Sequence, residues 1–243
     1  LGDVYKRQAL FNARSTPLLF TVHNENRHPY DLELLDDYDR LTSRDDTPEL
    51  VVFHLMGQHV SYSDRYPKEE AYFTPGDIRR EDLTQQERQV VADYDNATRY
   101  NDQVVDAILA RFIDRDAIAV YLSDHGEEVY DYRDFFCRSH DLPLTPEVCK
   151  YQFEIPFMIW MSDTYRRNRP DVAAQVAGAL DRPFSADDLS HLLLDLAGIR
   201  CRWYDPARSL IGERFDTTRP RPLLMGFEPA GNYETIIGRD RKQ

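Results

Sequence analysis

Short runs of β-branched and apolar residues alternate with amphipathic stretches along the 243 residues of this chain. This alternation is typical of an α/β domain, in which a mainly parallel sheet is flanked by helices on both faces. With 42% hydrophobic residues and no linker rich in Pro, Gly or Ser, the chain is expected to form one domain around one core. Five runs have the composition and length of buried strands: 18–23, 50–55, 117–123, 155–161 and 223–227.

Two capping boxes mark the starts of helices. Thr84-Gln-Gln-Glu87 precedes apolar residues that recur at helical spacing, which predicts a helix over about 85–112. Ser185-Ala-Asp-Asp188 opens a second, shorter helix over 189–197, and Gly198 stands where a C-terminal cap is expected. In such a box, side chains and backbone amides at the helix start bond each other reciprocally.

The chain is acidic, because 30 Lys and Arg residues stand against 43 Asp and Glu residues, for a formal net charge of −13. This charge repels the phosphates of nucleic acids and of anionic membrane surfaces at long range, so a nucleic acid partner is not expected. No stretch approaches the roughly 18 consecutive apolar residues of a membrane-spanning helix, and the residues as given are expected to be soluble.

Three cysteines are too few for a disulfide framework. Cys137 and Cys149 flank a short loop and are candidates for a bridge in an oxidising compartment, whereas Cys201 stands apart in the sequence. The alternative is three reduced, buried thiols. The sequence leaves both possibilities open.

Long polar stretches without obvious regular structure follow two of the expected strands, at 57–82 and 126–151. Loops of this length in a compact domain are usually functional or disordered. Each stretch begins with histidine-bearing chemistry at the carboxyl end of a strand, where open α/β sheets bind their ligands. The functional site is therefore expected in these two loops.

The third expected strand runs directly into Ser123-Asp-His-Gly-Glu127. The carboxylate of Asp124 beside the imidazole of His125 is a suitable pair of ligands for Zn²⁺, and Mn²⁺ is also possible. Gly126 is expected to let the backbone turn sharply past the ion. The alternative, which is commoner for an isolated Asp-His pair, is a polar turn in which Asp124 accepts hydrogen bonds from backbone amides.

His59 is a second candidate, because it follows the strand expected at 50–55. A neutral imidazole there can bind a metal or donate to a phosphoryl oxygen, and His140 in the later loop is expected to join it. The other histidines are expected to be core, structural or ordinary loop residues: His23, His28, His54 and His191.

Taken in order, these segments resemble the latter part of the phosphoethanolamine transferase domain, a branch of the alkaline phosphatase superfamily with a sulfatase-like fold. The resemblance runs from about Ala9 to Phe227. The motif Leu55-Met-Gly-Gln-His59, followed by Arg65-Tyr-Pro67, is similar to a strand end of the family that reads Gly-Ser-His and then Arg-Tyr-Pro. Three further segments match the family's metal-binding motif, its later histidine and its next strand: Ser123–Glu127, His140 and Ile155–Trp160.

The resemblance implies that Asp124 and His125 are zinc ligands, and that His59 and His140 contact the transferred phosphoryl group or a second metal. It implies transfer of phosphoethanolamine from phosphatidylethanolamine, through a phosphorylated threonine, to lipopolysaccharide, on lipid A or a core sugar. The domain of such an enzyme faces the periplasm and is anchored in the bacterial inner membrane. A sulfatase or a phosphoglycerol transferase of the same superfamily is the first alternative, and a noncatalytic binding domain is the second.

The family's nucleophilic threonine, its first acidic metal ligand and its transmembrane helices would all precede Ala9. Residues 9–243 are therefore expected to be the C-terminal part of an incomplete domain, without transferase activity by themselves. Residues 1–8 match nothing periodic and are interpreted as a non-native leader. Thr16 and Thr21 lack the strand-to-helix setting of the nucleophile. Gln58 replaces a small residue of the family motif, which leaves the acceptor open.

Overall fold

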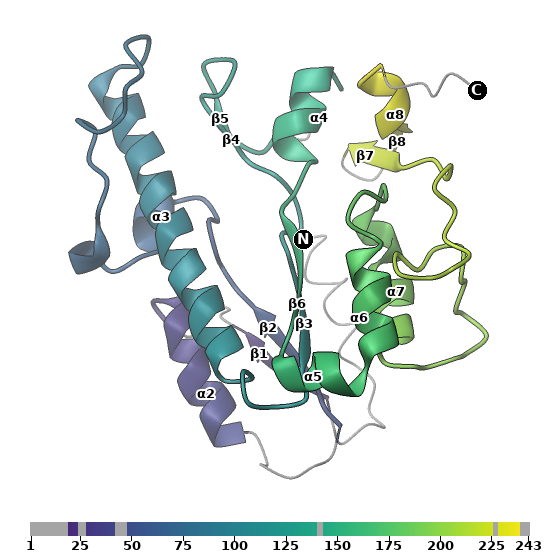
Figure 1. The fold of residues 1–243 in the computed structure, drawn as a ribbon. Helices are drawn as coiled ribbons and strands as arrows, with labels where there is room; N and C mark the ends of the chain where they lie inside the picture. The colour runs from purple at the N-terminus through teal and green to yellow at the C-terminus, as the bar shows by residue number, and fades with distance from the viewer. Residues whose placement is uncertain (1–18, 24–27, 42–47, 140–142, 226–227, 239–243) are drawn as a thin grey trace. The chain divides into compact units, whose positions relative to one another are not determined.

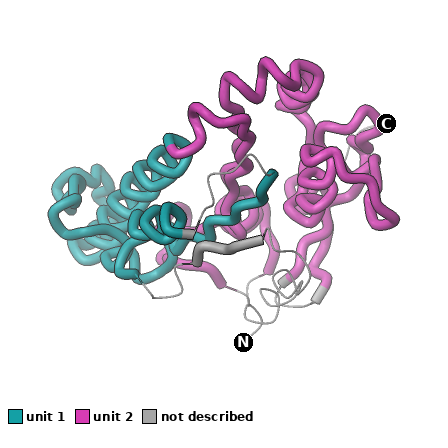
Figure 2. Tube along the Cα trace, turned by 90° about the horizontal axis from the view of Figure 1, so that it is seen from below, with its two compact units in different colours: residues 1–110 teal, residues 111–243 magenta. Residues whose placement is uncertain are grey.

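The computed structural model describes residues 19–23, 28–41, 48–139, 143–225 and 228–238. The chain divides into two compact units, Leu1–Ala110 and Arg111–Gln243, which Figure 2 colours separately. Residues 1–8 lie outside the described part, so their interpretation as a leader stays a prediction. Among the described residues, no helix combines the length and apolar character that crossing a bilayer requires.

The described residues of the first unit form a parallel pair of strands and two α-helices (Figure 1). Strands β1 (Leu19–His23) and β2 (Leu50–His54) run parallel, with His23 opposite His54. The 3-10 helix η1 (Asp31–Glu33) leads into α2 (Leu34–Leu41), and η2 (Tyr62–Asp64) and η3 (Lys68–Glu70) precede the long helix α3 (Gln85–Ala110). Helix α2 packs on β2 through the rings of Tyr38 and Phe53, whose centroids are 5.5 Å apart.

In the part of the second unit that the structure describes, the strands form three antiparallel pairs. Strand β3 (Ile118–Leu122) pairs with β6 (Phe157–Met161), β4 (Glu128–Val129) with β5 (Phe136–Cys137), and β7 (Pro222–Met225) with β8 (Glu228–Asn232). The helices that accompany them are α4 (Pro146–Gln152), α5 (Asp163–Asn168), α6 (Pro170–Ala177), η4 (Ala186–Asp188), α7 (Leu189–Leu196) and α8 (Tyr233–Ile236).

A buried apolar cluster forms the core of the second unit. Leu192 of α7 is fully buried, and Val176 of α6 belongs to the same cluster. Side chains of β6 pack against it: Phe157, Ile159 and Met161. Helices α6 and α7 therefore cover one face of β6, and the removal of this apolar surface from water is the main force that holds them there.

The positions of the expected strands and of the long helix are confirmed, as is the α/β class. The expectation of a mainly parallel sheet is wrong for the described residues, because only β1 and β2 pair in parallel. Strands β3 and β6 are both continuous apolar runs, which is the pattern of buried strands in either direction. Whether the two strands pair in parallel or antiparallel depends on the connection between them. Here that connection consists of the β4–β5 hairpin and α4.

The two capping boxes have different outcomes. At α3, the Thr84 amide donates to Glu87 Oε2 at 2.6 Å and the Glu87 amide donates to Thr84 Oγ1 at 3.3 Å, so this box is confirmed. The box expected at Ser185 does not form, because Ser185 makes no side-chain cap and the chain takes a 3-10 turn. The Asp188 carboxylate instead accepts from the guanidinium groups of Arg208 and Arg219. Gly198 has a φ of +66°, as expected of a helix C-terminal cap.

Thr84→Ala is expected to destabilise the start of α3 by about 1 kcal/mol, because the Glu87 amide loses its acceptor. Ser185→Ala is the matched control, since that hydroxyl makes no cap, and it is expected to change local stability by less than about 0.5 kcal/mol. Native-state amide exchange at 85–88 and at 186–189 measures both. Equal effects at the two sites would contradict the assignment of the caps.

The polar stretch at 57–82 is held on α3 by a buried asparagine. Asn96, which is 2% exposed, accepts from the backbone amides of Tyr72 and Phe73, both at 2.8 Å, and donates to the Phe73 carbonyl at 2.9 Å. Tyr66 donates its hydroxyl proton to Asp93 at 2.7 Å. Burial, and then this bond, raise the pKa of Tyr66 to about 12. The tyrosine of the Arg65-Tyr-Pro67 motif is therefore a structural anchor.

The three cysteines are free thiols, so the structure favours the reduced alternative over a bridge between Cys137 and Cys149. Cys149 is buried, Cys137 is half-buried and Cys201 is exposed. Burial raises the pKa of the Cys137 and Cys149 thiols. Both are therefore protonated and weakly nucleophilic near neutral pH.

Candidate metal-binding site

The turn that follows β3 carries the ligand pair expected from the sequence. The Asp124 side chain is 85% exposed and the His125 side chain 28% exposed, and Asp124 Oδ1 lies 3.8 Å from His125 Nε2. Ser123 closes the turn by donating its hydroxyl proton to the His125 carbonyl at 2.7 Å. A carboxylate and an imidazole therefore face each other at the carboxyl end of a strand.

A backbone carbonyl sets the tautomer of His125. Nδ1 of this ring lies 2.7 Å from the Gly126 carbonyl oxygen. A carbonyl oxygen only accepts, so Nδ1 must donate, and in the neutral ring the lone pair is on Nε2. This arrangement, in which one ring nitrogen donates to a carbonyl and the other is left to bind, is usual for metal-ligating histidines.

The spacing of the pair fits a single small cation. Two zinc–ligand bonds of about 2.0–2.2 Å each together span more than the 3.8 Å between Oδ1 and Nε2, so one ion can contact both atoms. In the described part of the chain no backbone amide donates to Asp124, so the hydrogen bonds expected of Asp124 in a polar turn do not form there, and metal binding by the pair stays a prediction. The described residues hold no group of three or more His, Cys, Asp or Glu side chains placed to bind a metal.

Gly126 is required by a close approach of two segments, and the expected sharp turn is not the reason. The amide of Gly126 donates to the Gln152 carbonyl at 3.1 Å. A Cβ atom at this position would lie 2.3 Å from the Tyr151 carbonyl oxygen and 3.0 Å from that of Glu154. The φ of Gly126 is outside the left-handed region, so what this position needs is the space that a side chain would fill.

His59 shows the same ring arrangement in the first unit. It is exposed, and Nδ1 lies 2.6 Å from the carbonyl oxygen of Val60. Nδ1 therefore donates, and Nε2 of the neutral ring carries a lone pair. Such a ring can bind a metal through Nε2, but it donates to a phosphoryl oxygen only after it gains a proton. His59 belongs to the first unit, whereas Asp124 and His125 belong to the second.

Asp31, which no sequence pattern marks as functional, holds the loop that carries His59. Asp31 is 6% exposed, and its two carboxylate oxygens accept from the amides of Met56 at 3.1 Å and Gly57 at 2.8 Å. Gly57 has a φ of +51°, which favours glycine. In the sequence, Asp31 looks like an ordinary acidic residue at a helix start, and nothing in the pattern links it to a loop 25 residues away.

Three of the remaining histidines have described side chains: His191, His28 and His54. His191 is 7% exposed and Nδ1 accepts from the Asp205 amide at 3.1 Å, which confirms a structural role. His28 bonds Asp37 at 2.7 Å; this bond raises the pKa of His28 and lowers the pKa of Asp37. His54 lies half-buried within β2. His140, and the side chain of His23, lie outside the described residues.

The family model described as Sulfatase matches residues 2–199, so this chain belongs to the sulfatase family. Among curated proteins it is similar to the phosphoethanolamine transferase EptC of Escherichia coli strain K12, with 33% identity over 201 residues, 80% of this chain and 33% of that protein. It is similar to CptA of Salmonella typhimurium strain LT2 at 31% identity over the same shares. The chain thus spans about a third of the length of these relatives.

Among solved structures, the C-terminal periplasmic domain of EcEptC from Escherichia coli has a TM-score of 0.73 and 32% identity, covering 87% of this chain and 60% of that one. A second structure of that domain, described as a complex with Zn, has the same TM-score and identity. The resemblance to phosphoethanolamine transferases and the sulfatase-like fold are therefore confirmed.

Proposed function

We propose that this chain contributes zinc-binding residues to the catalytic domain of a phosphoethanolamine transferase. The enzyme moves phosphoethanolamine from phosphatidylethanolamine to lipopolysaccharide, on lipid A or a core sugar. The observation that carries the proposal is the Asp124–His125 pair, in which the Gly126 carbonyl leaves His125 Nε2 as an acceptor 3.8 Å from a carboxylate oxygen. The similarity to EptC and CptA over 80% of the chain supports the choice of group transferred.

Each residue has a defined task in this proposal. Asp124 and His125 hold Zn²⁺, and the bond from His125 Nδ1 to a carbonyl orients the ring toward it. His59 offers Nε2 to a metal or, when protonated, donates to a phosphoryl oxygen, and His140 contacts the same group. Zinc, when bound, lowers the pKa of a coordinated hydroxyl and neutralises charge on the phosphoryl oxygens. The domain works on the periplasmic side of the inner membrane, as the similarity to a periplasmic domain suggests.

Asp124→Asn and His125→Ala are each expected to weaken zinc binding by the full chain at least tenfold, because each removes one ligand. Competition with a chromophoric chelator measures the affinity. Asp181→Asn is the matched control, since it makes the same substitution at an exposed position of the same unit. Unchanged zinc affinity in both ligand variants would contradict the assignment.

The same substitutions in the complete enzyme are expected to abolish transfer of phosphoethanolamine to lipopolysaccharide. Release of sulfate from an aryl sulfate, measured on the same preparation, separates the transferase from a sulfatase of this family. Sulfate release that depends on Asp124, with no transfer of phosphoethanolamine, would contradict the proposed reaction and leave the metal assignment standing.

A further inference from the structure

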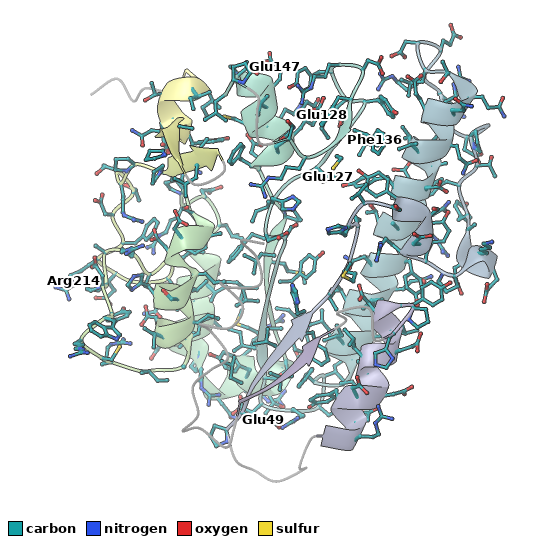
Figure 3. The ribbon with its side chains drawn as sticks, turned by 180° about the vertical axis from the view of Figure 1, so that it is seen from behind. Glu49, Glu127, Glu128, Phe136, Glu147 and Arg214 are labelled. Carbon is teal, nitrogen blue, oxygen red and sulfur yellow. The ribbon has the colours of Figure 1, made fainter. Side chains whose placement is uncertain are left out.

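Gln152, the last residue of α4, bonds to the candidate metal turn and to both ends of the β4–β5 hairpin. It is 1% exposed. Its Nε2 donates to Glu128 Oε2 at 3.2 Å, its Oε1 accepts from the Ser139 amide at 3.2 Å, and its own carbonyl accepts from the Gly126 amide at 3.1 Å. Figure 3 shows the labelled Glu128 beside α4, whose first turn carries the labelled Glu147.

Glu128, which accepts from the side-chain amide of Gln152, is itself held in place by Arg133. Glu128 is fully buried, and both its carboxylate oxygens accept from Arg133, at 2.8 and 2.7 Å. The Arg133 guanidinium lies 4.5 Å from the centre of the Phe135 ring, which limits its movement. A buried carboxylate needs all of its donors, so Glu128, Arg133 and Gln152 form one network that joins the β4–β5 hairpin to the end of α4.

This network reaches His125 through Gly126. The Gln152 carbonyl binds the Gly126 amide, and the Gly126 carbonyl binds His125 Nδ1 at 2.7 Å. Because no side chain separates Gly126 from α4, a shift of the helix end moves the turn directly. The orientation of the His125 imidazole therefore depends on where Gln152 is held.

We infer that Gln152 is a positioning residue for the metal site: its buried side chain fixes the end of α4, and the backbone there fixes the Gly126 turn and the His125 ring. This inference rests on the proposed function for its zinc readout. Partners outside the ligand shell typically change metal affinity by about 10–100-fold when they are lost, because the ligand is no longer oriented. Gln152 is expected to act within that range.

Gln152→Met keeps the length of the side chain and removes its hydrogen bonds. In the full chain it is expected to weaken zinc binding about tenfold or more. Without metal, amide hydrogen exchange at 123–127 is expected to become about tenfold faster, because the bond to Gly126 opens more often. Gln175→Met, the same change at an exposed position of α6, is the matched control and should alter neither quantity. If Gln152→Met does not fold, Gln152→Asn carries the same test, since its shorter amide cannot reach both partners.

Native zinc affinity and native exchange at Gly126 in a folded Gln152 variant would overturn the inference. A variant that lowers only the overall free energy of unfolding, and leaves both quantities native, would overturn it as well. If Asp124→Asn weakens zinc binding in the same series, the proposed function survives such a result. If Asp124→Asn also leaves zinc binding unchanged, the proposed function fails, and exchange in the metal-free chain alone decides whether Gln152 positions the turn.

Discussion

Gly126→Ala is expected to lower the free energy of unfolding of the second unit by about 3 kcal/mol. The added Cβ would lie 2.3 Å from the Tyr151 carbonyl oxygen, far inside the distance at which such atoms touch. That oxygen belongs to the backbone of α4. The clash is therefore relieved only if the end of α4 or the turn that follows β3 moves. Movement of either breaks the bond from the Gly126 amide to Gln152.

Fluorescence during urea denaturation measures this effect without interference from the first unit, because the two tryptophans, Trp160 and Trp203, both lie within residues 111–243. Gly178→Ala is the matched control. Its Cβ would lie 3.4 Å from the Ala174 carbonyl oxygen, an ordinary contact, and its φ is −74°. This control is expected to be neutral or to stabilise by about 0.4–1 kcal/mol. Equal losses at the two glycines would mean that the close approach at Gly126 is not what the fold requires.

The strands and the long helix could be predicted because their signals are local. The apolar spacing within α3 and the reciprocal bonds of Thr84 and Glu87 depend on residues a few positions apart. The hairpin of β4 and β5 escaped prediction because each strand has only two residues, too few for alternation to be seen. The Ser185 box was a false signal: Asp188 could bind a nearby amide, but the structure offers it Arg208 and Arg219, two cations that sequence spacing does not reveal.

The candidate site also contains some residues that local sequence predicts and others that it does not. Asp124 and His125 are adjacent in sequence and follow an obvious strand, so their facing arrangement could be expected. The roles of Asp31 and Gln152 could not, because each acts on a segment brought to it by the fold, such as the Met56–Gly57 amides or the Gly126 turn. Carboxamides and carboxylates that bind backbone at long range carry no periodicity that would mark them.

Arg133→Met is expected to destabilise the second unit by about 2–4 kcal/mol, because it leaves the Glu128 carboxylate buried without its cation. This loss of stability is smaller than the loss expected when one partner of a fully buried ion pair is removed, because the Arg133 side chain is 26% exposed, whereas Glu128 is 0% exposed. Met retains much of the apolar stem of Arg133 but loses the guanidinium that lies over the Phe135 ring, a contact worth about 0.5–1 kcal/mol of the expected change. Tryptophan fluorescence in urea again measures the change.

A double variant isolates the uncompensated charge as the cause. Glu128→Gln combined with Arg133→Met replaces the carboxylate with a neutral amide of the same shape, whose oxygen still accepts from Gln152. The double variant is expected to be more stable than Arg133→Met alone by about 1 kcal/mol or more, because no buried charge remains. Arg166→Met, which removes one partner of an exposed pair with Asp163, serves as the surface control and should cost less than about 1 kcal/mol. If the double variant is no more stable than Arg133→Met, the loss comes from the contacts of the Arg133 side chain with its neighbours, and the uncompensated charge on Glu128 is not its cause.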